Sequence, residues 1–136
     1  MQISTYLAFD GQCAAAFKLY EKVLGGKIEM MMTNGESPMA DTVPAARRDR
    51  IMHARLVAGQ HVLMGADAPE GYYEGNKGFS VSIGVEDTAE AERIFNGLAE
   101  GGAVRMPLQK TFWAVAFGMV IDRFGIPWMV NCEAKP

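Results

Sequence analysis

The sequence predicts an α+β fold made of two βαβββ modules paired around a cleft. Two observations predict it: an alternating strand pattern followed by an amphipathic helix occurs twice, and both predicted helices end at a Gly-Gly pair, Gly25-Gly26 and Gly101-Gly102. Each half also contains more strand than one helix can cover, so the halves bury their sheets best by curving toward each other. The cleft inside such an arrangement is the natural place for a ligand.

The first half begins with a strand and a helix. Alternating residues predict the strand at Ile3, Thr5, Leu7 and Phe9, and a helix face follows at Cys13, Phe17, Tyr20 and Leu24. Gly25-Gly26 ends this helix, because glycine adopts the left-handed C′ conformation without steric cost. Further strands are expected at 27–32, 50–58 and 61–65, so the first module spans residues 1–65.

Residues 33–50 contain the breakers Asn34-Gly35, Pro38 and Pro44 and are predicted to form a long loop. A loop of this length can act as a lid over a ligand, and it can equally be disordered. Both interpretations stay open.

The same succession starts again at Phe79. A strand is expected at 79–85, and Asp87 or Thr88 can cap the next helix, whose apolar face is Ala91, Ile94, Phe95 and Leu98. Strands are expected at 103–107, 115–121 and 128–132, so the second module spans residues 79–133. The whole chain, 1–136, is expected to be a single domain with an internal repeat. A generic α+β domain with two coincidental strand–helix units is the alternative.

Composition narrows the class of protein. The 136 residues are 49% hydrophobic and 21% charged with a net charge of -3, as in an ordinary globular domain. The one basic cluster, Arg47, Arg48 and Arg50, is interrupted by Asp49, so no nucleic-acid partner is expected. No signal peptide or membrane span is expected, and two cysteines are too few for a secreted disulfide scaffold. The expected location is the cytoplasm.

Several motifs resemble a known superfamily. The stretches Tyr6-Leu7-Ala8-Phe9-Asp10-Gly11 and 16–26 are similar to the opening of vicinal-oxygen-chelate proteins, the glyoxalase/bleomycin resistance/dioxygenase superfamily. The PhnB-like subgroup is resembled by Met52-His53-Ala54, Gly101-Gly102, Met106-Pro107-Leu108-Gln109, Thr111-Phe112-Trp113, Phe117-Gly118, Asp122-Arg123-Phe124-Gly125 and Trp128-Met129-Val130-Asn131. The resemblance implies paired βαβββ modules and a homodimer. Whether the partners exchange modules or lie side by side stays open.

The resemblance also implies where a metal would bind. Relatives that use a divalent ion hold it with about four inward side chains, and the corresponding positions here are Thr5, His53, Phe79 and Met129. Only His53 is a good ligand for the usual metals, because Thr is a poor ligand, Phe is none and Met suits soft copper. No metal and no other cofactor are therefore predicted. A divalent metal at His53 and a metal-dependent glyoxalase- or dioxygenase-like enzyme remain the alternative.

The sequence does not contain the residue patterns that other catalytic mechanisms need. Cys13 is expected in the core, and Cys132 has no histidine near it in sequence to activate it. No Gly-x-Ser-x-Gly elbow, Walker loop or Gly-x-Gly-x-x-Gly is present. PhnB-like sequences carry a demethylubiquinone methyltransferase label, but Asp10-Gly11-Gln12 does not supply the Gly-rich loop of a classical methyltransferase.

The remaining interpretation is a pocket for a small organic molecule. Its predicted residues are Thr5, His53, Arg55, Phe79, Gln109, Trp113 and Met129. They combine flat apolar walls with a few polar groups, as ligand pockets do. The alternative is that these aromatics only fill the core. We predict a homodimeric, metal-free, small-molecule-binding protein of unknown ligand. A drug-sequestering protein of the bleomycin-resistance kind is a further alternative.

Overall fold

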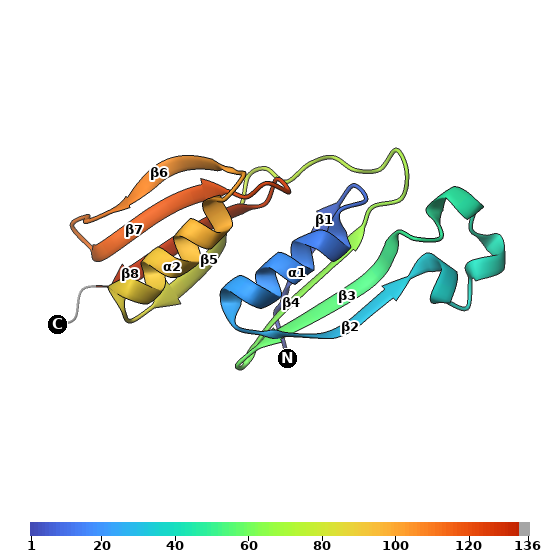
Figure 1. Cartoon of the computed structure of the whole chain (residues 1–136), viewed down its shortest axis with the longest axis horizontal. Coiled ribbons are helices and arrows are strands. Elements are labelled where there is room, and N and C mark those ends of the chain that lie inside the picture. Colours follow the sequence, from blue (N-terminus) through green and yellow to red (C-terminus); the bar gives the residue numbers. More distant parts are fainter. Residues whose placement is uncertain (134–136) are drawn as a thin grey trace. The chain divides into compact units, whose positions relative to one another are not determined.

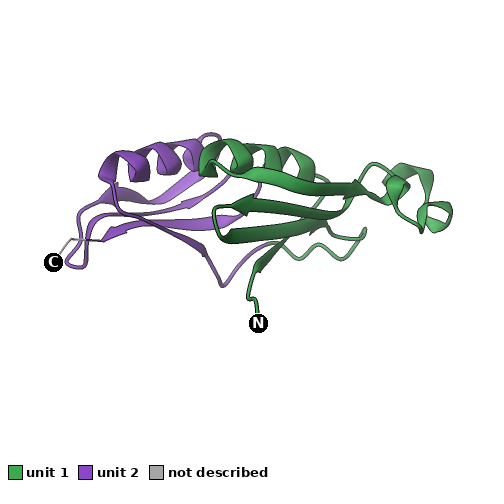
Figure 2. Ribbon diagram, turned by 90° about the horizontal axis from the view of Figure 1, so that it is seen from below, with its two compact units in different colours: residues 1–75 green, residues 76–136 purple. Residues whose placement is uncertain are grey.

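The computed structural model describes residues 1–133, which fall into two compact units, unit 1 (Met1–Gly75) and unit 2 (from Asn76 onward). Figure 2 colours the two units separately. Each is a four-stranded mixed sheet with one long helix, so the predicted α+β class is confirmed. None of the helices within residues 1–133 has the length and apolar character needed to cross a bilayer.

Unit 1 runs in the order β, α, β, β, β (Figure 1). Its elements are β1 (Thr5–Phe9), α1 (Cys13–Leu24), β2 (Lys27–Thr33), β3 (Ile51–Ala58) and β4 (His61–Asp67). The strands lie in the order β1-β4-β3-β2, with β1 parallel to β4 and the other pairs antiparallel. The last strand in sequence therefore sits inside the sheet.

One face of this sheet packs against α1. Phe17 contacts Phe9 edge-on, with ring centroids 6.1 Å apart, and both side chains are buried. Gly65 lies beneath the Phe17 ring, where a Cβ would come within 2.9 Å of a ring carbon. The helix ends at Gly25, whose φ of 72° is the left-handed conformation predicted for this position.

A buried carboxylate fixes the start of both α1 and β3. Asp67, the last residue of β4, accepts the Cys13 backbone N–H at 3.0 Å and the Ile51 backbone N–H at 2.8 Å. A helix N-terminus favours a negative charge because its first N–H groups have no partner within the helix. The strand that carries His53 and the helix beneath the sheet are thus tied to one side chain.

Unit 2 repeats the order and the topology. Its elements are β5 (Val81–Val85), α2 (Thr88–Ala99), β6 (Ala103–Gln109), β7 (Ala114–Ile121) and β8 (Pro127–Glu133), with the strands in the order β5-β8-β7-β6. Asp87 is the N-cap of α2, accepting the Ala89 N–H at 3.2 Å. The predicted helix face, Ala91, Ile94, Phe95 and Leu98, is the buried one.

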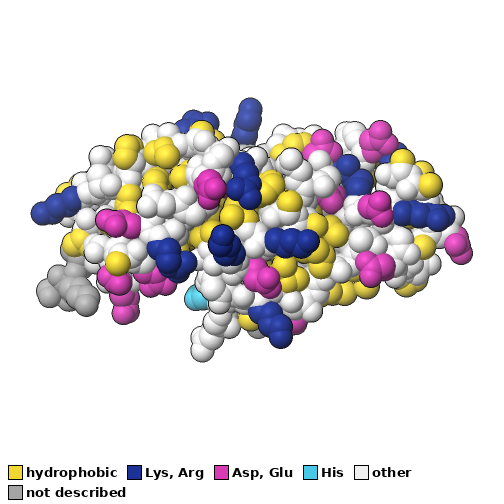
Figure 3. Space-filling model, in the orientation of Figure 1, with side chains coloured by type: hydrophobic (Ala, Val, Ile, Leu, Met, Phe, Trp, Pro, Cys, Tyr) yellow, Lys and Arg dark blue, Asp and Glu magenta, His cyan; other side chains and the backbone are white. Residues whose placement is uncertain are grey.

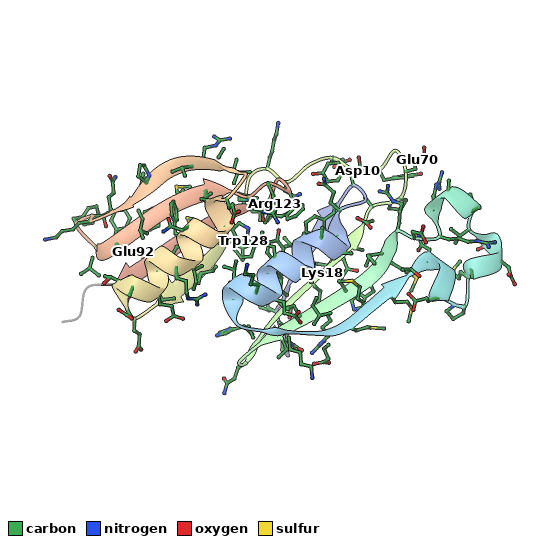
Figure 4. The ribbon with its side chains drawn as sticks, viewed as in Figure 1. Asp10, Lys18, Glu70, Glu92, Arg123 and Trp128 are labelled. Carbon is green, nitrogen blue, oxygen red and sulfur yellow. The ribbon has the colours of Figure 1, made fainter. Side chains whose placement is uncertain are left out.

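Asp122 organises the turn before β8. Its carboxylate accepts the backbone N–H groups of Phe124 and Ile126 and the indole N–H of the buried Trp128, at 2.9 to 3.0 Å. Figure 4 labels Trp128 beside α2. Three donors on one buried carboxylate hold the Trp128 ring in a fixed orientation under the helix.

Four strand boundaries differ from the sequence prediction by two residues, and others differ by one. Strand β1 begins at Thr5 rather than Ile3, β4 ends at Asp67 rather than Gly65, β5 begins at Val81 rather than Phe79, and β6 continues through Pro107 to Gln109. Proline is tolerated in β6 because this strand lies at the edge of its sheet. Element ends depend on hydrogen bonds to the neighbouring strand, which apolar alternation does not encode.

The predicted loop 33–50 contains three short 3₁₀ turns, η1 (Asn34–Glu36), η2 (Ala40–Thr42) and η3 (Ala45–Arg47). Side chains attach it to the rest of unit 1: Arg47 donates from Nε to Glu70 at 3.0 Å, and Arg50 donates to Asp10 at 3.0 Å and to the Ala68 carbonyl at 2.9 Å. Figure 4 labels Asp10 and Glu70 at this end of the unit. The segment is therefore a structured part of unit 1.

Charged side chains are mixed by sign on the surface. On the face drawn in Figure 3, lysines and arginines alternate with aspartates and glutamates, and apolar side chains lie between them. Such a face does not form the single-sign stripe that tracks phosphates.

Candidate functional site

The sheet face of unit 1 that is opposite α1 carries the candidate site. Strand pairing aligns one row of side chains across all four strands: Met30, Arg55, Met64 and Tyr6. His53 lies two residues before Arg55 on β3 and pairs with Met32 on β2. This face therefore combines methionine thioethers with three polar side chains, those of Tyr6, His53 and Arg55.

Tyr6 and His53 interact directly. The Tyr6 hydroxyl lies 3.1 Å from Nδ1 of His53, and the two rings are stacked, with centroids 5.8 Å apart and an interplanar angle of 24°. Burial, and to a lesser extent Cys13, raise the pKa of the Tyr6 phenol above its ordinary value. The phenol is thus protonated at neutral pH and can donate a hydrogen bond.

Arg55 adds a positive charge to this face. Its Nε lies 3.4 Å from Oε1 of Glu29 on β2. The geometry is that of an ion pair rather than a hydrogen bond, and the buried Nε–H has no hydrogen-bond acceptor among residues 1–133. A guanidinium with unused donors can bind an oxygen of a ligand.

Unit 2 has a face of similar build. Two rows cross its sheet on the side away from α2: one is Ser82, Met129, Met119 and Met106, and the other is Gly84, Asn131, Phe117 and Gln109. Trp113 packs edge-on against Phe117 at 5.2 Å, and Phe112 packs against Trp113 at 4.7 Å. The Phe112 side chain is 97% exposed. An aromatic ladder therefore leads from this sheet face to the surface.

Asn131 is a polar residue that sequence reasoning missed. Its Oδ1 is buried and has no hydrogen-bond partner within the described part of the chain. Gly84, opposite it on β5, leaves open space, since a Cβ there would meet nothing within 4 Å. The one indication in the sequence is that the polar Asn131 lies between two apolar residues, Val130 and Cys132, which are both in the core. An unpaired buried oxygen has a free-energy cost that stable cores avoid.

The structure distributes the predicted pocket residues over both units. His53 and Arg55 share the polar face of unit 1, and Gln109, Trp113 and Met129 belong to the second face. Phe79 precedes β5 and is 43% exposed. Thr5 does not share the face of His53: it pairs with Leu63 in the row that faces α1, and its neighbour Tyr6 reaches His53 instead.

The fold built from these two units defines a class of protein. It is the fold of the glyoxalase/bleomycin resistance/dioxygenase superfamily. A domain described as glyoxylase/bleomycin resistance protein/dioxygenase from Frankia sp. EAN1pec matches with a TM-score of 0.65 over 98% of each chain; at 16% identity this likeness concerns the fold alone.

Within that class, residues 1–131 match the family described as 3-demethylubiquinone-9 3-methyltransferase, and the chain belongs to this PhnB-like family. Protein YjdN of Escherichia coli K12 is 34% identical, over 96% of this chain and 95% of its own. The crystal structure of protein PA1353 from Pseudomonas aeruginosa is 54% identical, with a TM-score of 0.92 and 99% of both chains covered. A putative 3-demethylubiquinone-9 3-methyltransferase, PhnB protein, from Bacillus cereus has a TM-score of 0.82 at 21% identity over 98% of this chain and 100% of its own.

The family description implies a methyl-donor cofactor, and the turn after β1 does not fit one of the classical kind. Gly11 is the one glycine there, and the Arg50 guanidinium lies within 3.4 Å of where its Cβ would be. Arg50 is itself bonded to Asp10. The turn is thus occupied by a side chain and presents no glycine-rich cradle.

The superfamily also implies a divalent metal, and the donor set around His53 does not fit one. The side chains beside His53 are a phenol and a thioether, and residues 1–133 contain no group of three His, Cys, Asp or Glu placed to hold an ion. A stable site needs several nitrogen, oxygen or thiolate ligands. A metal-free protein stays a prediction.

Proposed function

We propose that this chain is a small-molecule-binding protein that binds its ligand on the face of unit 1 bearing Tyr6, His53 and Arg55. The observation that supports the proposal most is the Tyr6–His53 pair, two hydrogen-bonded and stacked rings on the face of the unit 1 sheet that is opposite α1. Flat rings and thioethers offer contact area to an organic molecule, and the few polar groups orient it.

We further propose that the chain works without a metal, as a homodimer, in the cytoplasm. Its two units derive from an internal repeat within one domain. The matching order of elements and strands in the two units supports the repeat. The buried free thiols Cys13 and Cys132 suit a reducing compartment.

Two measurements test the proposal. Protein purified without a metal-affinity tag is analysed for bound metal, and the expected content is well below one equivalent per chain. A panel of small aromatic acids, phenols and amines is then titrated into ¹⁵N-labelled protein, and the expected chemical-shift changes concentrate at residues around His53. His61→Ala is the matched control, since His61 is exposed at the start of β4.

Two outcomes would contradict the proposal. One equivalent of divalent ion per chain that disappears in His53→Ala indicates a metal centre. Binding that is unchanged in both histidine variants indicates a site elsewhere.

A further inference from the structure

We propose that Tyr6 holds His53 in the Nε2–H tautomer, so that this face donates hydrogen bonds and selects ligands with a carbonyl or carboxylate oxygen. This inference rests on the proposed function and adds the chemical class of the ligand and a positioning residue.

Tyr6 has to extend across one intervening strand to contact His53. In the sheet, β4 lies between β1 and β3, so Tyr6 and His53 extend from strands that are not neighbours. Two strand spacings amount to about 9.6 Å, which only a long side chain covers. The 3.1 Å contact therefore depends on the tyrosine ring lying over β4 toward β3. A threonine or serine at this position would be too short.

The relative basicity of the two groups decides where the proton of the Tyr6–His53 hydrogen bond lies. A neutral phenol and a neutral imidazole share one proton in their hydrogen bond. Imidazole nitrogen is the stronger base, with an ordinary pKa near 6.5 for its conjugate acid, and a phenol oxygen is a weak acceptor. The favoured arrangement is therefore O–H of Tyr6 donating to Nδ1 of His53. An imidazole that accepts at Nδ1 carries its proton on Nε2.

In this tautomer, His53 and Arg55 both present hydrogen-bond donors to a ligand. Nε2 of His53 has no hydrogen-bond partner among residues 1–133, so its N–H is free to donate. Two residues along β3, Arg55 brings further N–H donors that are not used by Glu29. Both groups stand beside the thioethers of Met32 and Met64. Donors above an apolar floor match a planar molecule that carries an oxygen acceptor, and an anionic oxygen gains most from Arg55.

The same tautomer bears on metal binding. A metal ligand must present a lone pair, and in the proposed state the Nε2 position holds a proton instead. Coordination through Nε2 requires the Tyr6 hydrogen bond to reverse, with Nδ1–H donating to the phenol oxygen. The tautomer thus separates a hydrogen-bonding histidine from a metal-ligating one.

The experiment reads the tautomer directly. Long-range ¹H–¹⁵N correlation spectra of the full chain with ¹⁵N-labelled histidine are recorded at pH 8.5, above the ordinary imidazole pKa. His61→Ala assigns the remaining signal to His53. The expected spectrum of His53 is that of a single Nε2–H tautomer. In Tyr6→Phe, which retains the ring but loses the hydroxyl, a shift toward a mixture of tautomers is expected. An Nδ1–H tautomer in the wild type overturns the inference.

The ligand class is tested with two probes of equal ring size, benzoate and benzylamine. Benzoate is expected to bind at least tenfold more tightly than benzylamine, and His53→Ala is expected to weaken benzoate by roughly tenfold, because a hydrogen bond to a charged group is lost. Equal or stronger binding of benzylamine overturns the inference while the proposed function stands. Failure of every compound in the panel removes the proposed function itself, whichever tautomer is observed.

Discussion

Cys13 begins α1 with its side chain fully buried, close to the carboxylate of Asp67. Burial, and after it the charge of Asp67, raise the pKa of the Cys13 thiol to about 12 from an ordinary 9.0. The folded chain therefore keeps a proton that the unfolded chain releases between these two values. The stabilisation that this thiol provides is complete below pH 9 and is lost as the pH rises toward 12.

The direction of this pH dependence can be tested with a Cys13 variant. In Cys13→Ala the free energy of unfolding is expected to fall by about 1 kcal/mol at pH 7, because buried atoms are lost, and to decline less steeply than in the wild type between pH 9 and 11. Urea unfolding at pH 7, 9, 10 and 11 measures both slopes. Subtracting the two profiles cancels every titrating group that the proteins share. Parallel profiles would show that the thiol ionises alike in the folded and unfolded chains.

Single residues also show how far sequence reasoning reaches into the site. Strand alternation alone puts His53 and Arg55 on one face of β3, and the structure has them there. Thr5 is in the predicted pocket set, although the alternation with Leu7 and Phe9 already puts it on the core side. The unpaired Oδ1 of Asn131 was beyond prediction, because a missing partner is a property of the packed structure.

Among the elements, the contact between α1 and β4 is set by one glycine. A Cβ on Gly65 would lie 2.8 Å from the Leu7 carbonyl oxygen and 2.9 Å from the Phe17 ring. Gly84 is also in a strand, and a Cβ on it would meet nothing within 4 Å. The two positions form a matched pair that differs in the space available.

Gly65→Ala is expected to lower the free energy of unfolding by about 1–3 kcal/mol, since the added methyl group forces α1 away from the sheet. Gly84→Ala is expected to change it by less than about 0.5 kcal/mol. Thermal or urea unfolding of the three proteins measures the difference. If Gly65→Ala lowers the free energy of unfolding no more than Gly84→Ala does, the Phe17 ring moves aside without cost and the predicted clash is wrong.

The helices were predicted more accurately than the strand ends and the 3₁₀ turns. A helix face such as that of α2 repeats an apolar residue every three or four positions, and Gly25 marks an end through its own backbone preference. The turns η1, η2 and η3 are three residues each, too short for any periodicity. Arg47 and Arg50 hold them through partners that are remote in sequence.

At the scale of the whole molecule, the ladder of Phe112, Trp113 and Phe117 concerns assembly. Phe112 is almost fully exposed and Trp113 is 43% exposed. Exposed aromatics in contact with one another are frequent at protein interfaces. The proposed homodimer would remove them from water.

Sedimentation equilibrium at micromolar concentration is expected to give the mass of a dimer of 14.8 kDa chains. Phe112→Ser is expected to weaken the dimer at least tenfold, because it removes an exposed aromatic. Tyr72→Ser is the control, since Tyr72 is a comparably exposed aromatic at 76%. A wild-type monomer at these concentrations contradicts the homodimer. If Phe112→Ser and Tyr72→Ser weaken the dimer equally, the aromatic ladder is not the dimer interface.

The strand order has a consequence for biosynthesis. Strand β1 lies at the edge of its sheet and pairs with β4, and β5 lies at the edge of the other sheet and pairs with β8. A nascent chain that has emerged only as far as β3 therefore has its first strand without the neighbour it pairs with in the sheet. Each sheet is completed when its last strand inserts between two strands that were synthesised earlier. In unit 1 that strand also brings Asp67 to the N-terminus of α1. Ribosome-bound chains would acquire structure in two late steps, one for each unit.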